Sequence, residues 1–267
     1  MDPAVNTVVS KKFNSTIDSD VTFKSSDGVL FHVHRKNLEV CTGGFPPAEI
    51  STKDEIVDLT ETSATLELLF QFMYPRRHPS LDTTPFEVLE PLAEAAEKYQ
   101  VFPAMNICHI RMRDMVNDHP VAVAVYAAKH DYPYLVSEVA PMMLSMPPVD
   151  VISMLPPYLV LPWTRYVQEW TDILQTIALA DVSSAVGSHL NGQNCNRVWP
   201  VFALGCMQRL GAGVHTLRSL DKVFDISTER AMLGVPNDCC TNALKEWRER
   251  IEAGIAQIPK FNIFLSY

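Results

Sequence analysis

Two apolar alternations separated by a polar turn form the first clear pattern in the chain. Val21–Lys24 alternates apolar and polar residues, and apolar residues recur at every second position of Val29–Val33. This period places alternate side chains on one face of a strand. In the intervening segment, Gly28 can adopt the positive φ that a tight turn requires. The pattern predicts a β-hairpin over residues 21–33.

Helical periodicity follows the hairpin. A short helix is expected to begin near Arg35 and to end at Thr42–Gly44. A short strand at Glu55–Leu59 then leads to three amphipathic helices, the first capped by one of the hydroxyl residues in 60–63. Their stripes are Leu66, Leu69, Phe70 and Met73, then Leu89, Leu92, Ala93, Ala96 and Tyr99, then Met105, Cys108 and Met112. This order predicts an α+β domain in which helices cap a small sheet.

Beyond about residue 117 the strand-like alternation disappears, and a mainly α-helical C-terminal region is expected. Prolines or the polar stretch Asn191–Asn196 separate the predicted helices, which are Pro120–His130, Tyr134–Leu144, Trp163–Ala180 and Val198–Leu210. A last amphipathic helix, ended by Pro259, carries Leu244, Trp247, Ile251, Ile255 and Ile258. Its polar face mixes both signs of charge, which favours packing against its own domain over lying on a membrane surface.

Composition narrows the functional classes. Hydrophobic residues make up 47% of the 267 residues, enough apolar surface for a folded protein. The formal net charge is −9, and the densest basic clusters, Arg76–His78 and Arg111–Arg113, are short. Because an acidic chain without a basic patch repels phosphate backbones, nucleic-acid binding is disfavoured.

The expected localisation rests on three features: signal peptides, membrane spans and disulfide patterns. The first residues contain no apolar stretch of signal-peptide length, and prolines interrupt the most apolar segment, Val149–Trp163, so no membrane span is expected. Irregular spacing argues against a disulfide framework for the six cysteines, which are Cys41, Cys108, Cys195, Cys206, Cys239 and Cys240. Reduced thiols in the cytoplasm or nucleus are the simplest interpretation.

A series of short motifs in the first half resembles the BTB/POZ domain family in order and spacing. The motifs are Ser19–Phe23, Ser26–Gly28, Phe31–Arg35 with Leu38, Val57–Leu59, Leu66–Pro75 and Leu92–Val101. The segment Gly43–Pro47 is similar to the form that this loop takes in the large BTB sets of mushroom-forming fungi. The resemblance divides the chain into a flexible N-terminus at 1–17, a BTB/POZ domain at 18–117 and a helical C-terminal region at 118–267.

The resemblance implies a non-enzymatic protein–protein interaction module. BTB domains form homodimers or bind other proteins, and many are adaptors for cullin-type ubiquitin ligases or parts of regulatory complexes. Asp20 and Arg35 match an acid and a base that lie near the dimer contact in related domains. With Leu38, they are the candidate partner-binding residues. A carboxylate at the start of a buried strand also needs a cation or backbone donors, so an internal role for Asp20 stays open.

The sequence departs from the best-known branches of the family. It has no zinc-finger spacing, no basic tail and no kelch repeat period. The loop before the third strand, where a cullin-binding element is expected, offers only Pro47–Glu49 as a poor match.

Candidate chemistry is sparse. His32 and His34 could supply two metal ligands from one strand face, but a zinc site needs three or four, so polar or capping roles are favoured. Cys239 and Cys240, with Cys195 and Cys206, lack CxxC spacing and are interpreted as packing or free thiols. Nucleophile elbows and phosphate-binding loops are absent from the sequence. We therefore predict no catalytic, cofactor or metal residues. The alternative is a metal- or ligand-binding regulator that uses the C-terminal region.

Overall fold

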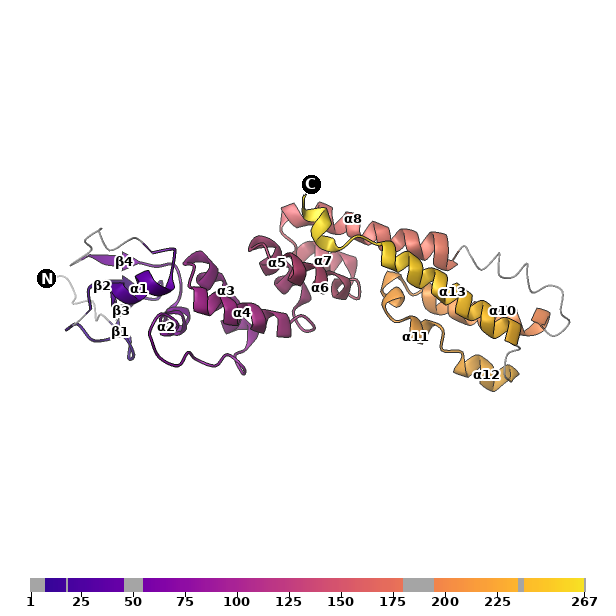
Figure 1. The fold of residues 1–267 in the computed structure, drawn as a ribbon, viewed down its shortest axis with the longest axis horizontal. Helices are drawn as coiled ribbons and strands as arrows, with labels where there is room; N and C mark the ends of the chain where they lie inside the picture. Colours follow the sequence, from indigo (N-terminus) through magenta and orange to yellow (C-terminus); the bar gives the residue numbers. More distant parts are fainter. Residues whose placement is uncertain (1–7, 18, 46–54, 180–194, 235–237, 267) are drawn as a thin grey trace. The chain divides into compact units, whose positions relative to one another are not determined.

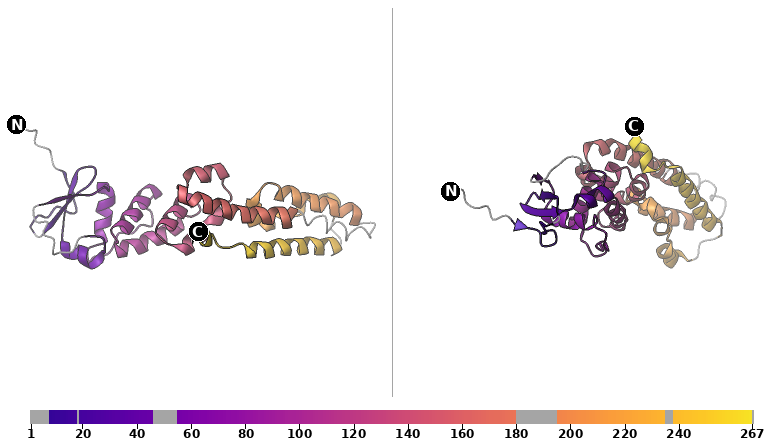
Figure 2. Two further views of the ribbon diagram at one scale, coloured as in Figure 1. Left: turned by 90° about the horizontal axis from the view of Figure 1, so that it is seen from above. Right: turned by 60° about the vertical axis from the view of Figure 1, so that its left-hand side comes forward.

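The computed structural model describes residues 8–17, 19–45, 55–179, 195–234 and 238–266 (Figures 1 and 2). The chain forms two compact units, Met1–Asp118 and His119–Tyr267. Each unit has its own core and is described separately.

A four-stranded sheet in the order β1-β3-β2-β4 organises the first unit (Figure 1). The predicted hairpin is confirmed: β2 (Val21–Lys24) and β3 (Val29–Val33) pair antiparallel, and Gly28 has a φ of 84° in the turn. Strand β4 (Ile56–Asp58) runs parallel to β2, and β1 (Val8–Val9) runs parallel to β3.

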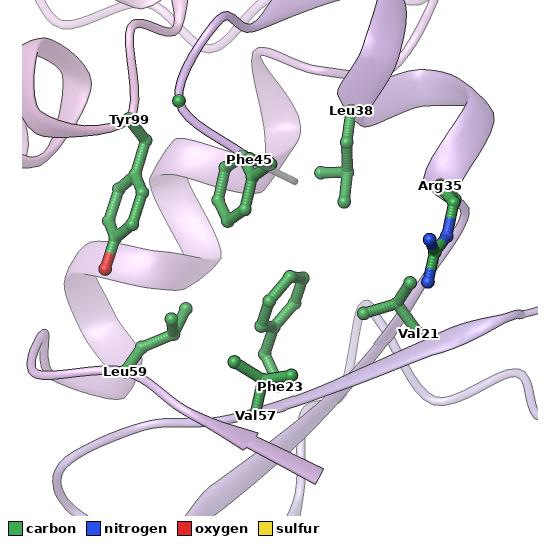
Figure 3. A pocket seen from close by; sticks show the side chains of 9 residues that line it. Val21, Phe23, Arg35, Leu38, Phe45, Val57, Leu59 and Tyr99 are labelled. Carbon is green, nitrogen blue, oxygen red and sulfur yellow. The ribbon is translucent and has the colours of Figure 1, made fainter. Parts of the chain in front are cut away.

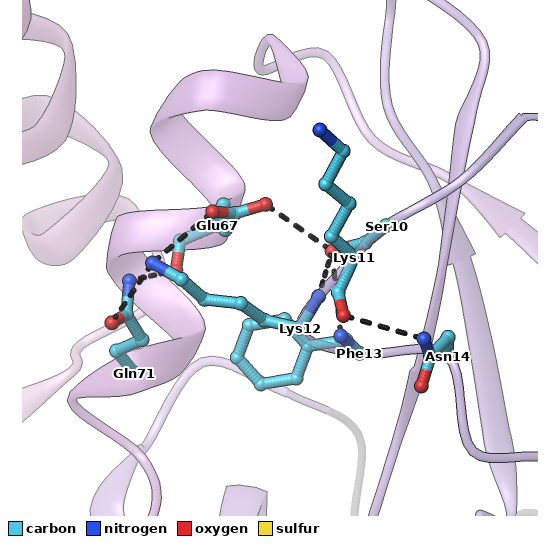
Figure 4. Close-up of polar contacts among 7 residues, drawn as sticks. All are labelled: Ser10, Lys11, Lys12, Phe13, Asn14, Glu67 and Gln71. Atoms are coloured by element: carbon cyan, nitrogen blue, oxygen red, sulfur yellow. Dashed lines mark hydrogen bonds and ion pairs between the residues drawn. The ribbon is translucent and has the colours of Figure 1, made fainter.

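Residues 8–13, which the resemblance assigns to a flexible N-terminus, contribute strand β1 and the buried ring of Phe13. Figure 4 shows how this segment attaches to the helix behind it: Lys12 Nζ lies 3.2 Å from Glu67 Oε1, and Ser10 Oγ donates to Glu67 Oε2 at 3.3 Å. Lys12 also donates to Gln71 Oε1 at 3.3 Å. Two strand residues are too few to produce a readable alternation, so sequence periodicity could not place β1.

The described residues of this unit also form four helices: α1 (Arg35–Cys41), α2 (Ser63–Gln71), α3 (Phe86–Lys98) and α4 (Phe102–Asp114). The hydroxyl of Thr62 accepts the backbone N–H of Thr65 and caps α2, as expected. All the predicted stripe positions of α2 and α3 are buried. The α+β arrangement of a small sheet covered by helices is therefore confirmed.

Aromatic rings join the sheet to α2. The ring centroid of Phe70 lies 5.7 Å from that of Phe13, 5.5 Å from Phe23 and 5.4 Å from Phe31. Each such pair contributes about 0.5–1.5 kcal/mol beyond the area it buries. Phe23 and Phe31 of the hairpin thus share one core with Phe70 of α2.

Helices are the regular elements of the second unit in its described residues. Its elements are α5 (Pro120–Lys129), α6 (Pro133–Met143), α7 (Pro148–Met154), α8 (Pro157–Ile173), the π-helix η1 (Leu174–Leu179), α10 (Cys195–Leu210), the 3₁₀ helix η2 (Val214–Arg218), α11 (Leu220–Val223), α12 (Ser227–Leu233), α13 (Asp238–Gln257) and the 3₁₀ helix η3 (Phe261–Ser266). None of the helices described is long and apolar enough to cross a membrane.

Prolines begin four of these helices. Each of α5 to α8 has a proline in its first turn, where the missing N–H would have no helical partner anyway. The expected start of a helix at Trp163 is wrong, because α8 begins at Pro157 and runs through Pro162. Pro162 lies in the second turn, where it removes only one bond, the one to the carbonyl of Tyr158.

The long helix α13 packs against its own unit, as its mixed polar face predicts. Trp247 is fully buried, and its Nε1 donates to the carbonyl of Ala178 at 3.1 Å. Gly254 allows a close approach, since a Cβ there would lie 2.7 Å from Ile177 Cδ1. These contacts fix α13 against η1.

Candidate protein-interaction site

An apolar hollow opens in the first unit between the sheet, α1 and the chain that follows α1 (Figure 3). Its volume is about 210 Å³. Most of its wall is aliphatic or aromatic, and Arg35 is its single charged lining residue among those described. The lining residues are Val21, Phe23, Arg35, Leu38, Gly44, Phe45, Val57, Leu59 and Tyr99.

Two glycines hold one wall of the hollow against the end of α3. The backbone N–H of Gly44 donates to the carbonyl of Tyr99 at 3.0 Å, and that of Gly43 donates to Gln100 at 3.2 Å. A Cβ on Gly44 would lie 2.7 Å from the Tyr99 backbone, so only glycine fits without movement. This approach lets the ring of Phe45 stack on Tyr99, with centroids 4.7 Å apart and planes 9° apart.

Polar contacts fix the Tyr99 ring from the other side. Its hydroxyl donates to Glu61 Oε2 at 2.7 Å, and Lys98 Nζ donates to Glu61 Oε1 at 2.7 Å. Burial, together with the hydrogen bond to Glu61, raises the pKa of Tyr99 to about 12. Burial alone would raise the pKa of Glu61, but the hydrogen bonds from Lys98 and Tyr99 outweigh it and lower that pKa. At neutral pH this wall therefore carries a neutral phenol bound to a charged carboxylate.

The three candidate partner-binding residues all lie at or beside α1. Asp20 is exposed, and its Oδ1 accepts the backbone N–H of Arg35 at 2.6 Å. Arg35 is the first residue of α1, so this bond satisfies a donor that has no partner within the helix. Leu38 is 4% exposed and forms part of the wall of the hollow that Arg35 also lines. Asp20 thus has the backbone donor that its position requires, and it holds the start of α1.

The histidines take polar and capping positions. His32 Nδ1 lies 3.0 Å from Thr22 Oγ1, and His34 Nδ1 lies 2.9 Å from the hydroxyl of Tyr74. His32 lies on β3, but His34 follows the strand and is the N-cap residue of α1. The two histidines therefore do not project from one strand.

The cysteines of the C-terminal region do not converge on a described site. Cys206 and Cys240 are buried and Cys239 is exposed, while the side chain of Cys195 lies outside the described residues. Burial raises the pKa of Cys206 to about 11, which disfavours its thiolate. Within the described part of the chain, no group of three or more His, Cys, Asp or Glu side chains could hold a metal ion.

Sequence reasoning missed the hollow itself. Its wall combines Phe45, Val57 and Tyr99 from three segments that only the fold brings together. The one local signal was the glycine pair before Phe45, because adjacent glycines ahead of an aromatic residue are typical of a close backbone approach.

A BTB/POZ domain family model matches residues 9–115, from β1 to just past the end of α4. No curated protein matches the chain. The matched range contains the sheet, the four helices and the hollow, and BTB/POZ domains are generally non-enzymatic modules for binding proteins. Residues 9–115 of this chain are therefore a BTB/POZ domain, a protein–protein interaction module.

Proposed function

We propose that the BTB/POZ domain binds a second copy of itself beside α1, and that the protein is a scaffold for a regulatory complex. The apolar hollow next to Arg35 carries this proposal. At about 210 Å³ it is smaller than the roughly 300–1,000 Å³ of small-molecule pockets, so it suits an inserted side chain better than a cofactor. Buried apolar anchors in such hollows dominate the energy of many protein interfaces.

Exposed apolar side chains elsewhere in the domain supply suitable anchors. Val40 on α1 is 76% exposed, and Val8 and Ile56 on the two edge strands are 59% and 51% exposed. Edge strands also present backbone groups that can pair with another chain. A second copy carries both the hollow and these anchors, which is the condition for a two-fold symmetric interface.

Arg35 gives the hollow its charge, and Asp20 gives Arg35 its position. Asp20 binds the backbone N–H of Arg35, and the hollow is lined by the Arg35 guanidinium. We propose that it binds an acidic or carbonyl oxygen of the second copy, while Leu38 contacts the inserted side chain.

Light scattering on the full chain at micromolar concentration tests this proposal. The expected mass is twice 29.9 kDa. Arg35→Glu should shift the mass toward one chain, whereas Arg77→Glu, the same charge change at an exposed position outside the hollow, should not. A single-chain mass for the unmodified protein, or equal effects of the two variants, would contradict the proposal.

A more specific version of this proposal is that the protein is an adaptor for a cullin-type ubiquitin ligase. The segment expected to contact a cullin, Pro47–Glu49, lies outside the described residues. A pull-down with the N-terminal domain of a cullin tests this narrower hypothesis, and lack of association removes it while leaving self-association untouched.

A further inference from the structure

A second pocket lies wholly within the C-terminal unit, where the chain after α6 meets α10, η2 and α11. Its volume is about 550 Å³. Its described lining includes three cations and three hydroxyl groups but no carboxylate. The lining residues are Ser145, Arg209, Ala212, His215, Thr216, Arg218, Ser219, Lys222 and Val223. This is an unusual composition in a chain with a net charge of −9.

Arg209 forms a fixed wall of the pocket. Its Nε donates to the carbonyl of Val223 at 2.7 Å, and its Nη1 lies 2.9 Å from Oε1 of the buried Glu229. Glu229 therefore balances the charge of Arg209. The contacts join α10 to α11 and α12 beside the pocket.

Arg218 and Lys222 provide charge that no described carboxylate balances. Arg218 Nη1 donates to Ser145 Oγ at 3.0 Å, and neither cation forms an ion pair with any residue that the structure describes. The neighbouring acid, Asp221, lies 2.7 Å from Arg248 Nη1 on α13 instead. Among the described residues, Arg218 and Lys222 thus lie at one pocket without a paired carboxylate, and this produces a local potential that attracts anions.

The hydroxyl groups complete a donor set for an anion. Ser145 Oγ accepts from Arg218, so its own hydrogen is available to a bound ligand. Ser219 lines the same pocket between the two cations in the sequence. Charged and hydroxyl donors together are the groups that bind phosphate oxygens in proteins.

We propose that this pocket binds a terminal phosphate group, either that of inorganic phosphate or that of a phosphorylated peptide. A phosphate monoester carries about −1.5 to −2 charges at pH 7, which matches the two unbalanced cations. The pocket volume falls within the roughly 300–1,000 Å³ range of ligand sites. This site belongs to the C-terminal unit and does not depend on self-association of the BTB/POZ domain.

Calorimetric titration of the full chain with inorganic phosphate tests the proposal first. Saturable binding at one site per chain is expected. A short acetylated phosphoserine peptide and its unphosphorylated form follow as second and third probes. Tighter binding of the phosphopeptide identifies a peptide-borne phosphate, and binding of inorganic phosphate alone identifies a free one. No saturable binding of either phosphate probe would overturn the proposal.

Charge variants locate the binding. Lys222→Gln and Arg218→Gln should each weaken phosphate binding about tenfold, the loss expected for one charge-assisted hydrogen bond. Lys245→Gln removes the same charge from α13, where Lys245 pairs with Glu249 at 3.7 Å, and should leave binding unchanged. Lys222 forms no ion pair with a described residue, so tryptophan fluorescence should show an intact unit. Equal losses in Lys222→Gln and Lys245→Gln would mean diffuse charge attraction and would overturn the site.

Discussion

The BTB/POZ domain and the C-terminal unit build their cores differently. The first core depends on rings far apart in sequence, with Phe13, Phe31 and Phe70 meeting between sheet and helix. The second joins helices, some of them also far apart in sequence, since the ring centroids of Tyr166 on α8 and Phe261 on η3 lie 5.3 Å apart. The second unit contains all four tryptophans of the chain. Long-range aromatic contacts therefore stabilise both cores, but the first joins a sheet to helices, whereas the second joins helices to helices. Because the BTB/POZ domain contains no tryptophan, tryptophan fluorescence measures unfolding of the C-terminal unit alone.

The largest expected effect is a loss of stability that is confined to the core of the BTB/POZ domain. Phe70→Ala removes the ring that contacts three other aromatic rings and should destabilise the BTB/POZ domain by about 3–5 kcal/mol. Urea titration followed by circular dichroism should show this loss, while the midpoint by tryptophan fluorescence stays fixed. Phe102→Ala, at a position 52% exposed, is the control and should have little effect. A parallel shift of the tryptophan midpoint would show that the two units unfold together.

A smaller loss of stability is expected from a substitution at Gly44, where the chain after α1 approaches the end of α3. Gly44→Ala places a methyl group against the Tyr99 backbone and should cost about 1–3 kcal/mol. Gly43→Ala is the matched control, since its methyl group would meet only the flexible side chain of Gln100. Circular dichroism in urea measures both variants. Equal stabilities would mean that the close approach of Gly44 does not shape the hollow.

The smallest expected effect is the contribution of Glu61 to stability, which depends on pH. Because the folded state lowers the pKa of Glu61, the carboxylate stabilises the domain above the ordinary value of 4.5, and this contribution disappears as pH falls through the lowered pKa. Glu61→Gln should therefore cost about 1 kcal/mol at pH 7 and progressively less in acid. Glu39→Gln, at an exposed position on α1, is the control and should cost little at pH 7. A pH-independent cost for Glu61→Gln would contradict the role of its charge.

Sequence periodicity predicted elements well where they were long enough to show a full period. The hairpin could be predicted because a two-residue apolar period flanks a turn that contains Gly28. Helix α2 could be predicted because a capping hydroxyl precedes its apolar stripe. Strand β1 and helix α11 span too few residues to repeat a pattern. Helices α7 and α12 were not predicted, although α1, which has the same length, was.

The candidate site was only partly predictable. Motif resemblance selected Asp20, Arg35 and Leu38, and the structure brings all three to α1. Phe45 and Tyr99 were not recognised as parts of a wall, because their stacking depends on a backbone contact between distant segments. The cationic pocket of the C-terminal unit was missed for the same reason: Ser145 lies far in sequence from Arg218, to which it is hydrogen-bonded.

Concentration-dependent hydrogen exchange of the full chain tests most directly whether a second copy covers the hollow. Dilution that separates the copies should accelerate amide exchange in α1 (Arg35–Cys41) while exchange in α13 stays constant. Exchange in α1 that is identical at every concentration, in a protein shown to be associated, would place the contact elsewhere and contradict the proposed interface.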